Sequence, residues 1–190
     1  MSFEFYDDPG CGGLDRQYML GDRVLVAPVF SPDGVVDYFL PQGDWTHLLT
    51  GEVVSGGGWR RGRFDYFGLP VFVRPNSLVP IGATEERPDY NFPRGVIFHL
   101  FALDDGATAE AVVPDLRGDP ALKVRASRAR AEIIAEIDQR QAETERWRVL
   151  LHGIFELADD SAEAIATFTK EGLLLEMNGG TRRVSVTLKT

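Results

Sequence analysis

The sequence predicts an all-β protein, because turn residues recur at short intervals and the segments between them are short and either apolar or alternating. Many short strands separated by Gly, Pro, Asn and Asp clusters are typical of a β-sandwich or a β-barrel. The clusters lie at residues 31–34, 41–44, 56–58, 74–76, 104–106, 117–120 and 178–180. The last segment has the clearest period of two, since Val184, Val186 and Leu188 alternate with polar residues.

In chain order, the first expected strand is the apolar run Val24–Phe30, whose flanking turn signals suit a strand that is buried on both faces. Four further segments are expected as strands, at residues 35–40, 69–74, 77–81 and 96–101. The polar stretch Ala83–Asn91 precedes the last of these and is expected to be a linker between two halves. A chain of 190 residues can form one domain or two small ones.

Residues 131–151 fit two structures. They are rich in good helix formers, and Ile133 and Ile137 have the spacing of a helical stripe. The same stretch also alternates, with one strand face made of Ala131, Ile133, Ala135 and Ile137 and another made of Trp147, Val149 and Leu151. The residues of this stretch favour helix and strand about equally. The all-β context favours a hairpin that turns between Gln139 and Glu145.

Charge and composition exclude several classes of function. The formal net charge is -9, whereas nucleic-acid binding requires clustered Lys and Arg, and the basic cluster Trp59–Arg63 is expected to be a solvated turn or an interdomain contact. The one cysteine, Cys11, excludes an intrachain disulfide framework and agrees with a reducing compartment. Because the sequence shows no signal peptide and no apolar run near the roughly 20 residues of a membrane span, a soluble cytoplasmic protein without a membrane partner is expected.

Chemically active side chains show no recognisable pattern. The three histidines, His47, His99 and His152, share no metal-ligand spacing and are expected to be ordinary strand or surface residues. Cys11 lies in a glycine-rich loop without a base nearby in the sequence, which favours packing over catalysis. The glycine-rich segments at 10–13 and 55–59 match neither phosphate-binding motif and are expected to be turns.

Adjacent carboxylates occur at three places and are candidates for catalytic groups. The carboxylate pairs are Asp7–Asp8, Asp104–Asp105 and Asp159–Asp160. Glycosidases hold two carboxyl groups about 5–9.5 Å apart across a cleft, and neighbours on a turn diverge, so these residues are expected in turns and caps. Asp7–Asp8 before Pro9 favours the start of a helix.

Four aromatic residues, Trp45, Trp59, Tyr66 and Phe67, could form a sugar-stacking platform, although core or interdomain packing is the commoner use of such residues. The residues alone therefore indicate no catalytic, substrate-binding, cofactor or metal site, and no cofactor is expected. Taken without further information, this pattern indicates a binding or structural β module.

Several motifs follow one another in a fixed order through the first hundred residues. A D-x-Q-x-x-x-G-D segment contains Asp15, Gln17, Gly21 and Asp22. It is followed by "LVAPVF", "YFLPQGDW", "TG" and "LPVFVRPNSLVP", and "RPDYNFPRGVIFHLFALDDG" extends the series. This order resembles the C-terminal part of family-31 glycoside hydrolases, most closely the bacterial α-xylosidases, and the likeness is thin from about Ala121 to Thr190.

The resemblance implies a definite organisation. Members of this family have an N-terminal β domain, a catalytic (β/α)8 barrel and two C-terminal β-sandwiches, called proximal and distal. Residues 1–21 would be a remnant of the barrel end, with Phe3–Phe5 as its last strand and Asp15–Leu20 in the helical segment that leaves it. Residues 22–86 would form the proximal sandwich and residues 87–190 the distal one, both antiparallel.

The resemblance also carries an expectation about function. The two catalytic aspartates of the family lie upstream of the matching region, and no position here matches them. The chain would thus be a non-catalytic part of a retaining α-xylosidase-like enzyme that packs on and stabilises the catalytic barrel, its expected partner. An independent carbohydrate-binding module is the alternative. Surfaces that face the barrel should be apolar, which predicts self-association or disorder in about the first twenty residues.

Overall fold

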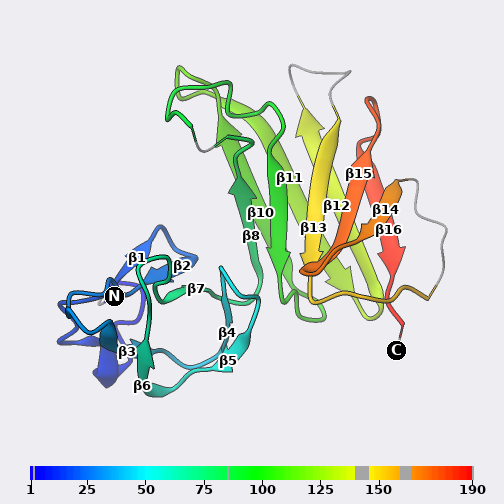
Figure 1. Ribbon diagram of the computed structural model, residues 1–190. Coiled ribbons are helices and arrows are strands. Elements are labelled where there is room, and N and C mark those ends of the chain that lie inside the picture. Colours follow the sequence, from blue (N-terminus) through cyan, green and yellow to red (C-terminus); the bar gives the residue numbers. More distant parts are fainter. Residues whose placement is uncertain (2, 85, 140–145, 159–163, 190) are drawn as a thin grey trace. The chain divides into compact units, whose positions relative to one another are not determined.

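The computed structural model describes residues 1, 3–84, 86–139, 146–158 and 164–189 (Figure 1). Apart from one short 3-10 helix, the regular elements are strands arranged in several sheets, which confirms the all-β expectation. The chain divides into two compact units, Met1–Pro75 and Asn76–Thr190. None of the described residues forms a helix long and apolar enough to cross a membrane.

The first unit contains a five-stranded sheet and a two-stranded ribbon, and all their strand pairs are antiparallel. The sheet order is β1 (Tyr18–Leu20), β2 (Val24–Val26), β7 (Val71–Val73), β4 (Asp44–His47) and β5 (Val53–Ser55). The ribbon pairs β3 (Val35–Leu40) with β6 (Gly58–Arg63). The 3-10 helix η1 (Pro9–Cys11) begins at Asp8, whose carboxylate accepts a hydrogen bond from the Gly10 amide, so the helix start expected at this point is confirmed.

The core of the first unit follows from the alternation in β3. Val36, Tyr38 and Leu40 are buried, and they pack in one cluster with Leu25 of β2 and Phe72 of β7. Successive side chains of a strand point to opposite faces, so a slip of one residue would turn this set outward. Burying a Leu or Phe side chain stabilises the fold by roughly 1.5–3 kcal/mol, which fixes the register of the ribbon on the sheet.

Gln17 completes the hydrogen bonding of β3 on the edge that β6 leaves open. Its side-chain nitrogen donates to the Phe39 carbonyl at 2.8 Å, and its side-chain oxygen accepts from the Phe39 amide at 2.7 Å. The residue is 7% exposed, so both backbone groups of Phe39 are paired away from water. A carboxamide carries a donor nitrogen and an acceptor oxygen side by side, so one glutamine can pair with both backbone groups of the same residue.

The N-terminal residues differ from the expected barrel remnant. Tyr18–Leu20, expected in a helical segment, is a strand that pairs with β2, because the three residues 21–23 fold the chain back as a hairpin with Gly21 at φ 65°. Phe3–Phe5, expected as a barrel strand, is a turn in which the amides of Glu4 and Phe5 both donate to the Met1 carbonyl. Phe5 packs instead on Trp45, with ring centroids 6.1 Å apart.

Only the first four residues of the apolar run Val24–Phe30 are buried as expected, and the strand is shorter than the run. All three residues of β2 are buried, and the ladder ends after Val26. Pro28 lacks an amide hydrogen and cannot extend the ladder. Beyond that point the chain is an irregular connection that reaches the surface at Phe30, which is 70% exposed.

The second unit is a sandwich of two sheets that face each other across one core (Figure 1). One sheet has the order β10 (Thr108–Pro114), β11 (Pro120–Ala129), β12 (Glu132–Gln139) and β16 (Arg183–Thr187). The other has the order β14 (Ile165–Phe168), β15 (Gly172–Met177), β13 (Trp147–His152), β9 (Ile97–Phe101) and β8 (Ser77–Ile81). All pairs are antiparallel except β9 with β13, which is parallel.

The parallel pair explains the path of the chain. Parallel neighbours need a long crossover connection, and here the chain leaves β9, forms β10, β11 and β12 in the opposite sheet, and returns as β13. The alternation seen at residues 131–151 is therefore that of two strands, but the expected hairpin is wrong. β12 and β13 lie in different sheets, where Ile133 and Val149 face the same core, and the turn expected at 139–145 falls largely on residues outside those described.

The boundary between the two units falls between Pro75 and Asn76, whereas it was expected between residues 86 and 87. β8 pairs with β9 along its whole length, and Leu78 is buried in the core of the second unit. The described part of Ala83–Asn91, without Glu85, is thus a connection between two paired strands of one unit. Phe92, the residue after this stretch, packs against the same core.

We predict that Gln17→Ala destabilises the first unit by about 1–3 kcal/mol, because it leaves the buried amide and carbonyl of Phe39 without partners. Urea unfolding followed by tryptophan fluorescence measures this change, since two of the three tryptophans, Trp45 and Trp59, belong to that unit. Gln42→Ala is the matched control at an exposed position and should change stability by less than about 0.5 kcal/mol. Equal effects of the two substitutions would contradict the role given to Gln17.

Candidate interaction surface and side-chain sites

Exposed large apolar side chains are concentrated in the first unit. Among the described residues, those of the first unit are Phe3, Tyr6, Tyr18, Leu20, Phe30, Leu49, Val53, Trp59, Tyr66 and Phe67. Those of the larger second unit are Ile81, Val112, Leu116, Phe155, Ile165 and Phe168. Single exposed apolar residues are ordinary on any protein, but a local excess marks a surface that binds a partner.

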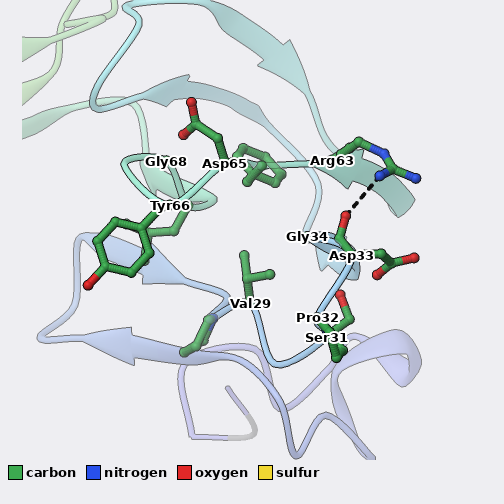
Figure 2. A pocket seen from close by; sticks show the side chains of 12 residues that line it. Val29, Ser31, Pro32, Asp33, Gly34, Arg63, Asp65, Tyr66 and Gly68 are labelled. Carbon is green, nitrogen blue, oxygen red and sulfur yellow. Dashed lines mark hydrogen bonds between the residues drawn. The ribbon is translucent and has the colours of Figure 1, made fainter.

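A hollow of the first unit lies between residues 28–34 and residues 63–69 and has a volume of about 1060 Å³ (Figure 2). Val29 and Tyr66 supply apolar lining, and Asp33, Arg63 and Asp65 supply charge. The Arg63 guanidinium donates to the Asp33 carbonyl at 2.9 Å and so joins the two connections (Figure 2). The hollow is therefore lined by both apolar and charged side chains.

Gly34 is required for the two connections to approach each other. Its φ is 75°, and a Cβ atom there would lie 2.2 Å from the Phe64 carbonyl oxygen. The Phe64 amide in turn donates to the Gly34 carbonyl at 2.9 Å. Only glycine tolerates both this backbone conformation and this contact, so the shape of the hollow is fixed by the backbone.

A second hollow of about 300 Å³ lies next to the first, and Pro28 and Ser31 line both. Phe30 and Trp59 line this second hollow. We call the region formed by residues 28–34, Trp59 and residues 63–69 the two-hollow surface. It carries four of the most exposed aromatic side chains of the unit, which are Phe30, Trp59, Tyr66 and Phe67.

The four aromatic residues of the possible sugar-stacking platform do not form a common surface. Trp45 is 1% exposed and belongs to the core, where its indole N–H donates to the Pro41 carbonyl at 2.9 Å. Trp59 and Tyr66 line different hollows. Phe67 packs edge-on against Tyr66, with ring centroids 5.5 Å apart. Trp59, Tyr66 and Phe67 are available to a partner, and Trp45 is not.

Two side chains considered for catalysis have packing roles. Cys11 is fully buried. Its burial is the main cause that raises the pKa of its thiol, and the nearby carboxylates add to this effect, so the thiolate is disfavoured. His47 is 7% exposed and lies face to face with Phe64, at a centroid distance of 6.3 Å. Burial lowers the pKa of His47, and its Nδ1 accepts a hydrogen bond from the Leu49 amide at 3.3 Å.

The described carboxylate pairs stabilise turns. Asp8 caps η1, and the Asp105 carboxylate accepts from the Arg130 amide. The Asp104 carboxylate accepts a hydrogen bond from the Asn76 side-chain nitrogen at 2.8 Å, and the backbone amide of Asp104 donates to the Asn76 side-chain oxygen at 2.7 Å. Asp159–Asp160 lies outside the described residues. Asp33 and Asp65, which share the larger hollow, likewise accept from the amides of residues two positions further along the chain.

The remaining two histidines form a pair that sequence spacing could not reveal. The Nδ1 atom of His99 and the Nε2 atom of His152 lie 2.9 Å apart, although 53 residues separate them in the chain. Burial and, secondarily, His152 lower the pKa of His99 to about 4. Burial also lowers the pKa of His152, against an opposing effect of Glu171, so both imidazoles are neutral near pH 7.

Two family models match the chain. The Glycosyl hydrolase family 31 C-terminal domain matches residues 1–79, and the C-terminal domain of Alpha-xylosidase YicI matches residues 91–188, which is more than half of the chain. The second match covers the residues where the likeness was thin in the sequence. Together they confirm the resemblance that the ordered motifs carry.

Curated relatives and solved structures agree with these matches. Alpha-xylosidase XylQ of Lactiplantibacillus pentosus is 34% identical over 137 residues, covering 70% of this chain and 18% of that protein. An alpha-xylosidase of Emericella nidulans is 32% identical over 152 residues, covering 73% of this chain and 19% of the relative. Among solved structures, an uncharacterized protein of Listeria monocytogenes, crystallised with glucose, magnesium and calcium, has a similar fold, with a TM-score of 0.79 and 17% identity. The match covers 100% of this chain and 20% of that protein's chain.

The chain spans less than a fifth of the length of the two curated relatives. The family matches lie at the C-terminal domains of much larger enzymes, and the all-β fold agrees with them. The chain therefore belongs to glycoside hydrolase family 31 and corresponds to the C-terminal domains of its α-xylosidase-like members.

Proposed function

We propose that this chain is the non-catalytic C-terminal region of an α-xylosidase-like retaining glycosidase, and that it packs on and stabilises the catalytic barrel through the two-hollow surface. The observation that carries the proposal is the excess of exposed aromatic side chains in the first unit. Tyr66 is 95% exposed and Phe67 is 89% exposed, and Phe30 and Trp59 of the same surface are 70% and 61% exposed. Such a patch is costly in water unless a partner covers it.

The composition of the surface supports a protein partner. Stable interfaces have an apolar centre in which aromatic residues are frequent, surrounded by a polar margin. The two-hollow surface contains both kinds of side chain: Phe30 and Trp59 line the smaller hollow, and Tyr66, Asp33 and Arg63 line the larger one. Because the backbone around Gly34 fixes the hollows, the surface needs little rearrangement before it docks.

The carboxylates of the surface do not suggest hydrolysis by these domains. A retaining glycosidase uses one carboxylate as nucleophile and another as acid and base, about 5–5.5 Å apart, and both must face the sugar. Asp33 and Asp65 instead use a carboxylate oxygen to hold their own turns, accepting from Val35 and Phe67. We therefore assign catalysis to the barrel of the parent enzyme and not to these domains.

We predict that the purified chain hydrolyses p-nitrophenyl α-xyloside no faster than a buffer blank, because it supplies no carboxylate pair in a cleft. The assay compares the chain with a mock purification from the same host, which measures contaminating glycosidase. Hydrolysis above both blanks that is lost in an Asp33→Asn, Asp65→Asn variant would contradict the non-catalytic assignment.

A chimera tests the docking role. It carries this chain in place of the matching C-terminal region of XylQ, and its heat inactivation is followed by α-xylosidase activity. We predict that Tyr66→Ser with Phe67→Ser lowers the inactivation midpoint by several degrees, because each buried aromatic anchor of an interface is worth about 2 kcal/mol or more.

The matched control for the chimera is Phe155→Ser with Phe168→Ser, which removes two exposed aromatic residues of the second unit. It should leave the midpoint of inactivation unchanged. In the isolated chain, all four substitutions should change unfolding stability by less than about 0.5 kcal/mol, because the side chains are exposed there. A chimera that tolerates both double variants equally would count against docking through this surface.

A carbohydrate-binding module is the second candidate, favoured by Trp59, which is 61% exposed and lines the smaller hollow beside Asp15 and Arg16. An exposed indole can stack on a sugar ring. This alternative predicts saturable binding of xyloglucan oligosaccharides by the isolated chain, measured by calorimetry, and loss of that binding in Trp59→Ala. The docking proposal predicts no such binding.

A further inference from the structure

The three strands β9, β13 and β15 bring together side chains that have no role in the proposed docking. His99 lies in β9 and His152 ends β13, on the side of their sheet opposite the core residues Phe98 and Leu151. Their facing ring nitrogens are 2.9 Å apart. Glu171, which directly precedes β15, completes a cluster in which one ligand atom from each residue lies within 4.8 Å of the others.

We propose that His99, His152 and Glu171 form a binding site for a divalent first-row transition-metal ion of the zinc type. Two imidazole nitrogens and one carboxylate oxygen are the ligand set of many zinc sites, which leave a fourth position for water. Imidazole ligands favour Zn²⁺, Ni²⁺ and Cu²⁺, whereas Ca²⁺ and Mg²⁺ favour oxygen ligands, so the site should discriminate against the latter.

The separation of the two histidines fits this ion with a small adjustment. Zinc lies about 2.0–2.1 Å from each imidazole nitrogen, so two nitrogens at tetrahedral positions are about 3.4 Å apart. The observed 2.9 Å separation is that of a hydrogen bond between neutral rings. An increase of about half an ångström, which side-chain torsions can supply, converts the pair into two ligands.

The surrounding structure orients the ligands. The Phe101 ring stacks on His152 at a centroid distance of 4.1 Å with an angle of 13°. The backbone of Glu171 is held at both ends, since its carbonyl accepts from the Gly153 amide at 3.0 Å and its amide donates to the Thr169 hydroxyl at 3.2 Å. Metal ligands that are positioned before binding lose less entropy when the ion arrives.

Gly172 allows this arrangement by letting Glu171 approach the end of β13. A Cβ atom at Gly172 would lie 2.0 Å from the Leu151 carbonyl oxygen, and its φ is 147°. A glycine next to Glu171 therefore lets the turn lie directly beside His152, with which Gly172 is paired. The ion would connect three adjacent strands at one end of the sheet, and binding to the folded state alone would stabilise that state.

The experiment titrates the chelator-treated chain with Zn²⁺ and follows heat release and the midpoint of thermal unfolding. We expect one saturable site per chain and a midpoint that rises with Zn²⁺, with a similar response to Ni²⁺ and none to Ca²⁺ or Mg²⁺. His99→Gln and His152→Gln should each abolish the response. Glu171→Gln should weaken Zn²⁺ binding by about tenfold or more, since even residues that only support a ligand cost about 10–100-fold.

Two control variants separate this site from other zinc ligands of the chain. His47→Gln removes the histidine of the first unit, and Cys11→Ser removes the thiol, and both should keep the full response to Zn²⁺. Glu171 is exposed, so its substitution leaves the fold intact and keeps the test decisive if a histidine variant is unstable. Absence of saturable binding by the unsubstituted chain would overturn the proposal, and so would Zn²⁺ binding by Glu171→Gln and His152→Gln with the affinity of the unsubstituted chain.

Discussion

The second unit depends on the parallel pairing of β9 with β13. A parallel neighbour cannot be reached by a tight turn, so the chain must build three strands of the opposite sheet before it returns. That path closes the sandwich over a single core, in which Phe98 and Val149 lie side by side in the pairing register. The same pairing brings His99 beside His152, so one topological constraint creates both the core and the proposed metal site.

In the first unit, a small core supports a surface of exposed aromatic side chains. Trp45 and Phe72 are almost fully buried under β3, while Trp59 of β6 and Tyr66 of the connection 63–69 are exposed to water. The close approach of that connection to residues 28–34 is fixed around Gly34. A monomer that functions alone has little reason to hold aromatic side chains in this way. Under the docking proposal, the catalytic barrel of the parent enzyme covers these side chains. The docking proposal concerns the first unit, and the metal proposal concerns the second unit.

Local pattern was sufficient to predict some elements and insufficient for others. The strands at Val35–Leu40 and Ser77–Ile81 were predicted with their observed bounds, because alternation and turn residues act over a few positions. Alternation cannot say which sheet a strand joins, and the hairpin expected between Gln139 and Glu145 was wrong for that reason. The pair of His99 and His152 and the contact of Gly34 with Phe64 depend on tertiary structure, so no local spacing signals them.

Amide hydrogen exchange tests docking through the two-hollow surface most directly, by comparing this chain alone with the same chain in the XylQ chimera. Docking predicts slower exchange in the chimera at residues 28–34 and 63–69, because a partner excludes water from those amides. The second unit's sandwich core should exchange equally slowly in both proteins. Unchanged exchange at residues 28–34 and 63–69, with new protection confined to the second unit, would contradict docking through this surface.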